Sequence, residues 1–99
     1  MLSINKTIEG SKLTVALSGR LDTTTAPELE KSLQESLSGV TELVMDLNAL
    51  EYISSAGLRV LLSAQKIMMK QGSMTVTHVS ETVMEIFEVT GFVDILTIE

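Results

Sequence analysis

Two adjacent serines, Ser54 and Ser55, stand where the sequence passes from a short loop into an apolar periodic segment. At the start of a helix, a serine hydroxyl can accept a hydrogen bond from a first-turn backbone N–H group. The same hydroxyl can act as a nucleophile when a base lies beside it. Helix capping and nucleophilic catalysis are therefore the first two chemistries to weigh for this pair.

A hydrolase built on Ser55 would need His78, because this is the single histidine of the chain. We expect His78 to lie in a strand, partly buried, with its ring satisfied by a backbone group. The residues around Ser55 also depart from the Gly-x-Ser-x-Gly pattern of the nucleophile elbow, since position 53 is isoleucine. These observations weigh against an enzyme.

Metal and cofactor sites have little support in the sequence. Cysteine is absent and glycines are scattered, so neither thiolate ligands nor a glycine-rich phosphate loop are available. Asp22, Asp46 and Glu51 could converge near strand ends, but acids in such places more often cap turns or face solvent. We predict no metal and no cofactor.

The composition is that of one small globular domain, residues 1–99, with a formal net charge of -6. Phosphate backbones repel such a chain, so direct nucleic-acid binding is not expected. The first residues do not resemble a secretory signal, and no apolar run is long enough to span a bilayer. With no cysteine, the sequence favours a cytoplasmic protein without membrane insertion, either a monomer or a weak dimer.

Alternating apolar residues at 1–8 and 12–18 around a glycine-containing turn predict a β-hairpin. A helix should open near Thr25 as its cap, with Glu28 completing a capping box, and end near Gly39. Strands are expected at 42–47, 74–79 and 93–98, and helices from Ser54 or Ser55 to Gln71 and at 80–89.

The apolar run in the first of those strands suggests a strand covered on both faces, and residues 48–53 are expected to form a connection. Strands separated by helices imply right-handed parallel crossovers, to which the hairpin adds an antiparallel edge. The predicted fold is an α/β domain with a mixed sheet of four to five strands flanked by three to four helices.

Three segments resemble the STAS domain family. Residues 46–61, DLNALEYISSAGLRVL, are similar to its central signature, in which a buried strand leads through a short loop to a helix. Residues 19–22, GRLD, resemble the family's segment before the first helix, and residues 88–92, EVTGF, resemble the end of its third helix. The likeness covers nearly the whole chain in the expected order of elements.

The resemblance implies an anti-sigma factor antagonist, a bacterial regulator of transcription that acts by partner switching. Unphosphorylated, it would bind an anti-sigma factor, often a serine kinase, and release the sigma factor; a PP2C-type phosphatase would reverse the phosphorylation. Aligned on Gly57, the phosphorylated position is Ser55. The preceding position, commonly Asp in the family, is Ser54 here, an alternative acceptor. The expected partner-binding residues are Asp22, Thr23, Thr24, Ser54, Ser55, Leu58, Arg59 and Leu62.

The serine at position 54 also motivates an alternative. STAS-like chains can resemble scaffold subunits of transporters or stress-sensing complexes that work without phosphorylation.

Overall fold

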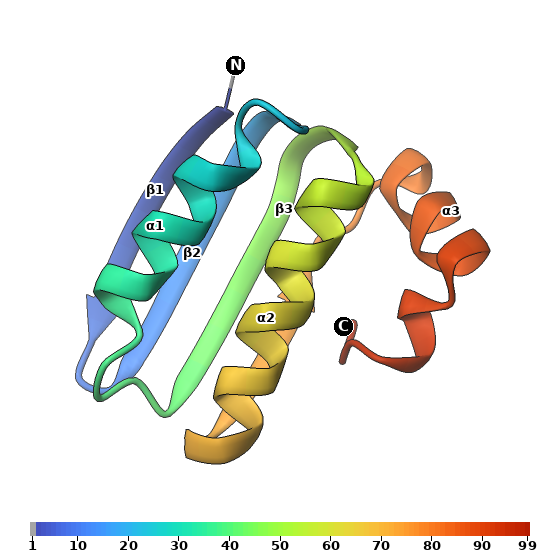
Figure 1. Cartoon of the computed structure of the whole chain (residues 1–99). Coiled ribbons are helices and arrows are strands. Elements are labelled where there is room, and N and C mark those ends of the chain that lie inside the picture. Colours follow the sequence, from blue (N-terminus) through green and yellow to red (C-terminus); the bar gives the residue numbers. More distant parts are fainter. Residues whose placement is uncertain (1) are drawn as a thin grey trace.

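The computed structural model describes residues 2–99 and begins with the predicted hairpin (Figure 1). Strands β1 (Leu2–Glu9) and β2 (Lys12–Leu21) run antiparallel. Gly10 has a φ of +63°, and among the described residues the only non-glycine with positive φ is His78. Of the two central residues of the turn, only the first has a positive φ. This is the pattern of type II′ turns, which match the twist of paired strands.

The rest of the chain alternates strands and helices, and the four strands form one mixed sheet in the order β1-β2-β3-β4. The pairs β2–β3 and β3–β4 are parallel, so the predicted mixed α/β architecture is confirmed. The elements after the hairpin are α1 (Ala26–Ser36), β3 (Glu42–Ile53), α2 (Ser55–Gln71), β4 (Ser73–Thr77), α3 (Glu81–Thr90) and the 3₁₀ helix η1 (Phe92–Asp94).

Two layers make up the molecule. Figure 1 shows α1 and α2 side by side in front of the sheet, with α3 beside α2. Along β3, Leu43 and Met45 are buried beneath the helices, whereas Val44 and Asp46 are half-exposed on the opposite face. The prediction of a strand covered on both faces is therefore wrong, because apolar Val44 belongs to the open face.

Helix α1 buries the face that its apolar spacing predicts, and α2 does so only in part. Helix α1 lies on the sheet through a stripe of leucines, and Pro27 occupies its first turn. In α2, Met68 is fully buried but Met69 is 73% exposed. The apolar residues that recur every three or four positions along and just after α1 are all buried: Ala26, Leu29, Leu33 and Leu37.

Strand β3 is longer than predicted. Residues 48–53, expected to form a connection, continue the strand beside β2 through two register shifts, after Ala16 and after Gly19. Each shift inserts an extra residue in β3, so the buried positions Leu47, Leu50 and Ile53 are three apart rather than two. The bulges thus break the alternation by which a strand is recognised in sequence.

The predicted strand at 93–98 is wrong. Gly91, with φ of +81°, ends α3 in a left-handed conformation, and the chain turns directly into η1. Only Ile98 forms a bridge, to Val76. No helix within residues 2–99 is both long and apolar enough to cross a membrane.

Candidate functional site

The turns β2–α1 and β3–α2 meet at one end of the sheet. Because β2 and β3 are parallel and Leu21 lies opposite Ile53, both strands finish at the same end of the sheet (Figure 1). The Ser54 N–H donates a hydrogen bond to the Leu21 carbonyl at 2.8 Å. This bond fixes the start of α2 against the end of β2.

Gly57 allows α2 to begin so close to the sheet. A Cβ atom added at this position would lie 2.7 Å from Leu21 Cγ and 2.9 Å from Ile53 Cγ1. Both neighbours are themselves buried and cannot easily move aside. The glycine is therefore required by close packing and not by its backbone angles.

The two serines have different roles. Ser54 is the N-cap of α2, and its Oγ accepts a hydrogen bond from the Gly57 N–H at 3.4 Å. Ser55 is the first residue of the helix and is exposed. Its hydroxyl has no hydrogen-bond partner among the described residues, so the fold does not use it.

In the β2–α1 turn, the side chains of Asp22, Thr24 and Thr25 are all hydrogen-bonded. The Asp22 carboxylate accepts hydrogen bonds from the Thr24 hydroxyl at 2.7 Å, the Thr24 N–H at 3.0 Å and the Thr25 N–H at 3.1 Å. Donation by the Thr24 hydroxyl, then by these backbone groups, lowers the pKa of Asp22. Thr23 and Thr24 are exposed at the tip of the turn.

Thr25 does not cap α1 as predicted. Its side chain makes no capping bond; instead Oγ1 accepts from the Asp22 N–H at 2.8 Å and donates to the Arg20 carbonyl at 2.9 Å. The hydroxyl is turned back toward the strand because Thr25 is 7% exposed and packed inside the turn. The predicted capping box with Glu28 is therefore wrong.

Most of the predicted partner-binding residues reach the surface at this end of the molecule. Ser55, Arg59, Thr23 and Thr24 are exposed, and the side chains of Asp22, Ser54 and Leu62 are half-buried. Leu58 is the exception: it is 5% exposed and belongs to the core, so it cannot contribute a docking side chain.

A feature that the sequence analysis missed lies one residue before the turns. The guanidinium carbon of Arg20 stands 4.5 Å from the centre of the Tyr52 ring, a cation–π contact between neighbouring strands. Arg20 and Tyr52 are 32 residues apart in the sequence, so no local pattern signals the pair. The contact adds a basic, aromatic element to the same end of the sheet.

His78 lies in a place that differs from its predicted one. It follows β4, has a φ of +56° and is exposed, with Nδ1 3.1 Å from Asp46 Oδ1. The expectation of a partly buried strand histidine bonded to a backbone group is wrong. Within residues 2–99, Asp46 is the only side-chain partner of His78, and no hydrogen bond joins His78 to Ser55.

The three acids proposed as metal-ligand candidates are not brought together. Asp22 is engaged by threonines, and Asp46 contacts His78 and the Asn48 N–H. Across residues 2–99 there is no group of three or more His, Asp or Glu side chains placed to hold a metal ion.

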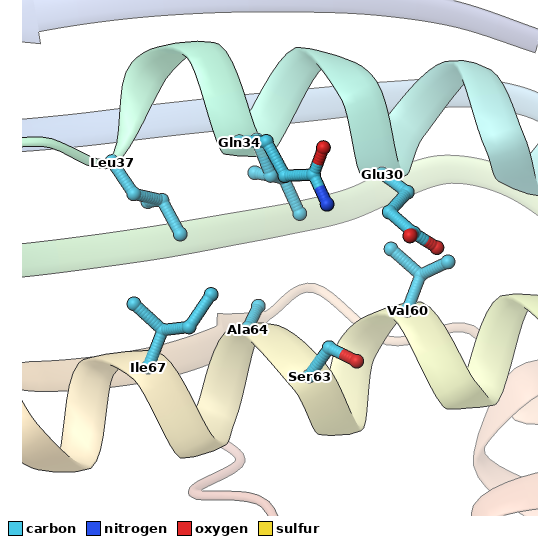
Figure 2. Close-up of a pocket in the computed structure, with 8 residues that line it drawn as sticks. Glu30, Gln34, Leu37, Val60, Ser63, Ala64 and Ile67 are labelled. Atoms are coloured by element: carbon cyan, nitrogen blue, oxygen red, sulfur yellow. The ribbon is translucent and has the colours of Figure 1, made fainter.

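A small recess separates α1 from α2 (Figure 2). Glu30 and Gln34 approach it from α1, and Val60, Ser63 and Ile67 line it from α2 (Figure 2). Its volume is about 60 Å³, whereas pockets for small-molecule ligands usually hold about 300 Å³ or more. We therefore read the recess as imperfect packing between two helices and not as a ligand site.

Comparisons with known proteins decide the family. The sequence model of the family described as "Mlab, STAS domain" matches residues 4–97. The chain belongs to the STAS domain family. It is 38% identical over 88 residues to BtrV of Bordetella bronchiseptica, described as an anti-sigma factor antagonist, covering 87% of this chain and 76% of that protein. The anti-sigma-B factor antagonist of Bacillus subtilis is 32% identical over 85 residues, covering 85% and 78%.

Solved structures show the same fold. An anti-sigma factor antagonist from Mycobacterium paratuberculosis superposes with a TM-score of 0.90 at 23% identity, covering 99% of this chain and 85% of that one. Unphosphorylated SpoIIAA superposes with a TM-score of 0.85 at 16% identity, covering 98% and 88%. The predicted STAS-type fold is confirmed, and so is the resemblance to anti-sigma factor antagonists.

Proposed function

We propose that this STAS domain is an anti-sigma factor antagonist that acts by binding and not by catalysis. In its unphosphorylated form it binds an anti-sigma factor through the start of α2 and the β2–α1 turn, and so frees a sigma factor. Phosphorylation of Ser55, by the anti-sigma factor acting as a serine kinase, blocks that contact. A PP2C-type phosphatase restores it, and the cycle takes place in the cytoplasm.

The observation that carries the proposal is the free hydroxyl of Ser55 beside an occupied one. Ser54 caps α2, so Ser55 is left exposed and without a partner among the described residues. A kinase can reach such a hydroxyl without unfolding the helix. Modification of Ser54 would instead remove the cap, which favours Ser55 as the acceptor.

The fold can accept a phosphate at this position. Phosphoserine adds about -1.5 to -2 charge, and the N-terminal end of a helix favours an anion through its free N–H groups and dipole. The first turn of α2 contains no acidic residue that would repel it. The effect of the phosphate should therefore fall on docking rather than on folding.

The surface around Ser55 explains why a phosphate would matter to a partner. Thr23, Thr24 and Arg59 lie at the same end of the molecule and are exposed, so a partner that covers this end also covers the Ser55 side chain. A phosphate there adds bulk and a strongly hydrated charge to a contact that binding must desolvate. A loss of roughly 3 kcal/mol would lower the affinity more than a hundredfold.

Calorimetric titration of variants against the cognate anti-sigma factor tests the proposal. We expect Ser55→Asp to weaken binding about a hundredfold or more and Ser55→Ala to leave it nearly unchanged. Ser38→Asp is the matched control, because this substitution adds the same charge at an exposed position after α1, at the other end of the sheet. Equal affinities for the aspartate and alanine variants at position 55 would overturn the switch.

The phosphorylation itself is tested by mass. Protein purified from its own host should carry one phosphate that is lost on phosphatase treatment, and Ser55→Ala should abolish it while Ser54→Ala should not. If no growth condition yields a phosphate, the alternative stands: a STAS scaffold subunit of a transporter or stress-sensing complex, which binds its partners without a switch.

A further inference from the structure

The two outer strands of the sheet, β4 and β1, differ in how their outward-facing backbone groups are paired. At β4, the Val76 N–H donates to the Thr97 carbonyl at 2.8 Å and the Glu99 N–H donates to the Val76 carbonyl at 2.9 Å. The C-terminal segment thus covers part of that edge. At the other edge, β1 pairs only with β2 within the described chain (Figure 1). An unpaired edge strand offers its N–H and C=O groups to another strand.

The hairpin determines which backbone groups of β1 are free. Glu9 lies opposite Lys12 across the two-residue turn, and such a closing pair is hydrogen-bonded. Hydrogen-bonded and non-bonded pairs alternate along an antiparallel ladder. The residues that turn their N–H and C=O groups away from β2, toward the free edge, are therefore Leu2, Ile4, Lys6 and Ile8.

We propose that this edge binds a second copy of the chain, with the two β1 strands antiparallel and Asn5 opposite Asn5 of the second copy. Leu2 then lies opposite Ile8 of the other strand, and Ile4 lies opposite Lys6. All four outward-facing residues of each strand find backbone partners. The sheet becomes continuous across eight strands, with the helices of both copies on one face.

Other registers fit less well. Directly opposed residues share a face of the sheet, so each strand must keep its even-numbered side chains toward the helices. A register centred on Lys6 would set two lysines directly opposite each other, which is unfavourable, and would leave Leu2 unpaired. One centred on Ile4 would leave Ile8 unpaired. The register centred on Asn5 leaves none of the four outward-facing residues unpaired and sets no two lysines opposite each other. It also places apolar Leu2 opposite Ile8, which is 63% exposed.

The proposed pairing leaves the Ser55 surface free and depends on salt. Helix α2 packs on β3 and β4, away from the β1 edge. Each copy carries a formal charge of -6, so the two copies repel each other at low ionic strength. Salt screens that repulsion, and we expect the dimer to strengthen as the salt concentration rises.

Cysteine cross-linking tests the pairing and its register in the full chain, which has no native cysteine. Asn5→Cys should form an intermolecular disulfide, because opposed non-bonded residues have Cα atoms about 4.5 Å apart. Thr7→Cys is the control on the same face, but two copies of residue 7 would be offset by about 14 Å along the strands. We expect cross-linking of Asn5→Cys to be at least about tenfold faster.

A second pair of variants tests the backbone bonds. Lys6→Pro removes an N–H that β2 does not use, whereas Lys6→Ala keeps it; both lose the Lys6 Nζ bond to Ser36 Oγ. Sedimentation should show a dimer for the wild type and Lys6→Ala, and a monomer for Lys6→Pro with an unchanged circular dichroism spectrum. Equal cross-linking of both cysteine variants, or a wild type that stays monomeric at about 1 mM in about 0.5 M salt, would overturn the proposal.

Discussion

The β2–α1 and β3–α2 turns lie side by side at one end of the sheet, but they use their polar side chains in opposite ways. In the first, Asp22, Thr24 and Thr25 are bonded to one another and to the backbone. In the second, one serine caps the helix and the next is left free. The first turn is held by its own hydrogen bonds and anchors the second through the bond from the Ser54 N–H to the Leu21 carbonyl, while the Ser55 hydroxyl stays exposed.

A substitution that adds a side chain at Gly57, beneath the second turn, should lower the free energy of unfolding the most. Gly57→Ala places a methyl group within 3 Å of Leu21 and Ile53, and such overpacking costs roughly 1–3 kcal/mol. Urea unfolding should show a lower midpoint with an unchanged slope. Partner affinity should fall as well, because α2 would have to shift away from β2. A Gly57→Ala variant as stable as the wild type would mean that the two turns are not tightly coupled.

Removing the buried hydroxyl of Thr25 from the first turn should cause the next largest loss in the free energy of unfolding. Thr25→Val keeps the shape of the side chain but leaves the Asp22 N–H and the Arg20 carbonyl without their hydroxyl partner. An unsatisfied buried group costs about 1–3 kcal/mol. Thr23→Val, at the exposed tip, is the control and should change the free energy of unfolding little. Equal losses for both variants would show that the turn is not held by its buried hydroxyl.

Alanine substitutions of the two serines in the second turn should differ in how much stability they remove. Ser54→Ala loses the N-cap and should cost about 1 kcal/mol. Ser55→Ala removes a hydroxyl that the fold does not use and should change the thermal midpoint very little. A reversed order would assign the cap to Ser55, and with it would go the main reason for regarding that hydroxyl as free.

The smallest effect concerns pH in the first turn. Since hydrogen bonds lower the pKa of Asp22 in the folded state, its ionised form adds stability above the unfolded pKa. That contribution is lost as the pH falls through the folded pKa. Asp22→Asn should therefore be less stable than the wild type at neutral pH, and the difference should shrink toward about pH 3. A gap that stays constant over this range would exclude the carboxylate charge as its cause.

The hairpin, the three helices and the parallel order were predictable, because each depends on local signals. Gly10 marks the turn, the leucines of α1 repeat every three or four residues, and Ser80 accepts the Val83 N–H as an N-cap. The paired serines likewise predicted where α2 begins; in the structure, Ser54 is its cap and Ser55 its first residue. These features depend on residues that are close in sequence.

Other features were decided by the tertiary structure. The bulges of β3 follow from its register with β2, the contact of Arg20 with Tyr52 joins two strands, and the C-terminal segment meets β4 through one bridge. Such pairings join residues that are far apart in the chain, so no local pattern encodes them.

The residue pattern around positions 43–61 is sufficient to predict a helix that begins with two serines after a buried strand. The pattern does not say which serine is the cap, because this depends on the bond from the Ser54 N–H to the Leu21 carbonyl and on the close packing of Gly57 against Leu21. The pattern also does not reveal that Leu58 lies in the core while Ser55 is exposed. The physical reason is that exposure depends on what other segments cover, and that is set only when the sheet and helices pack together.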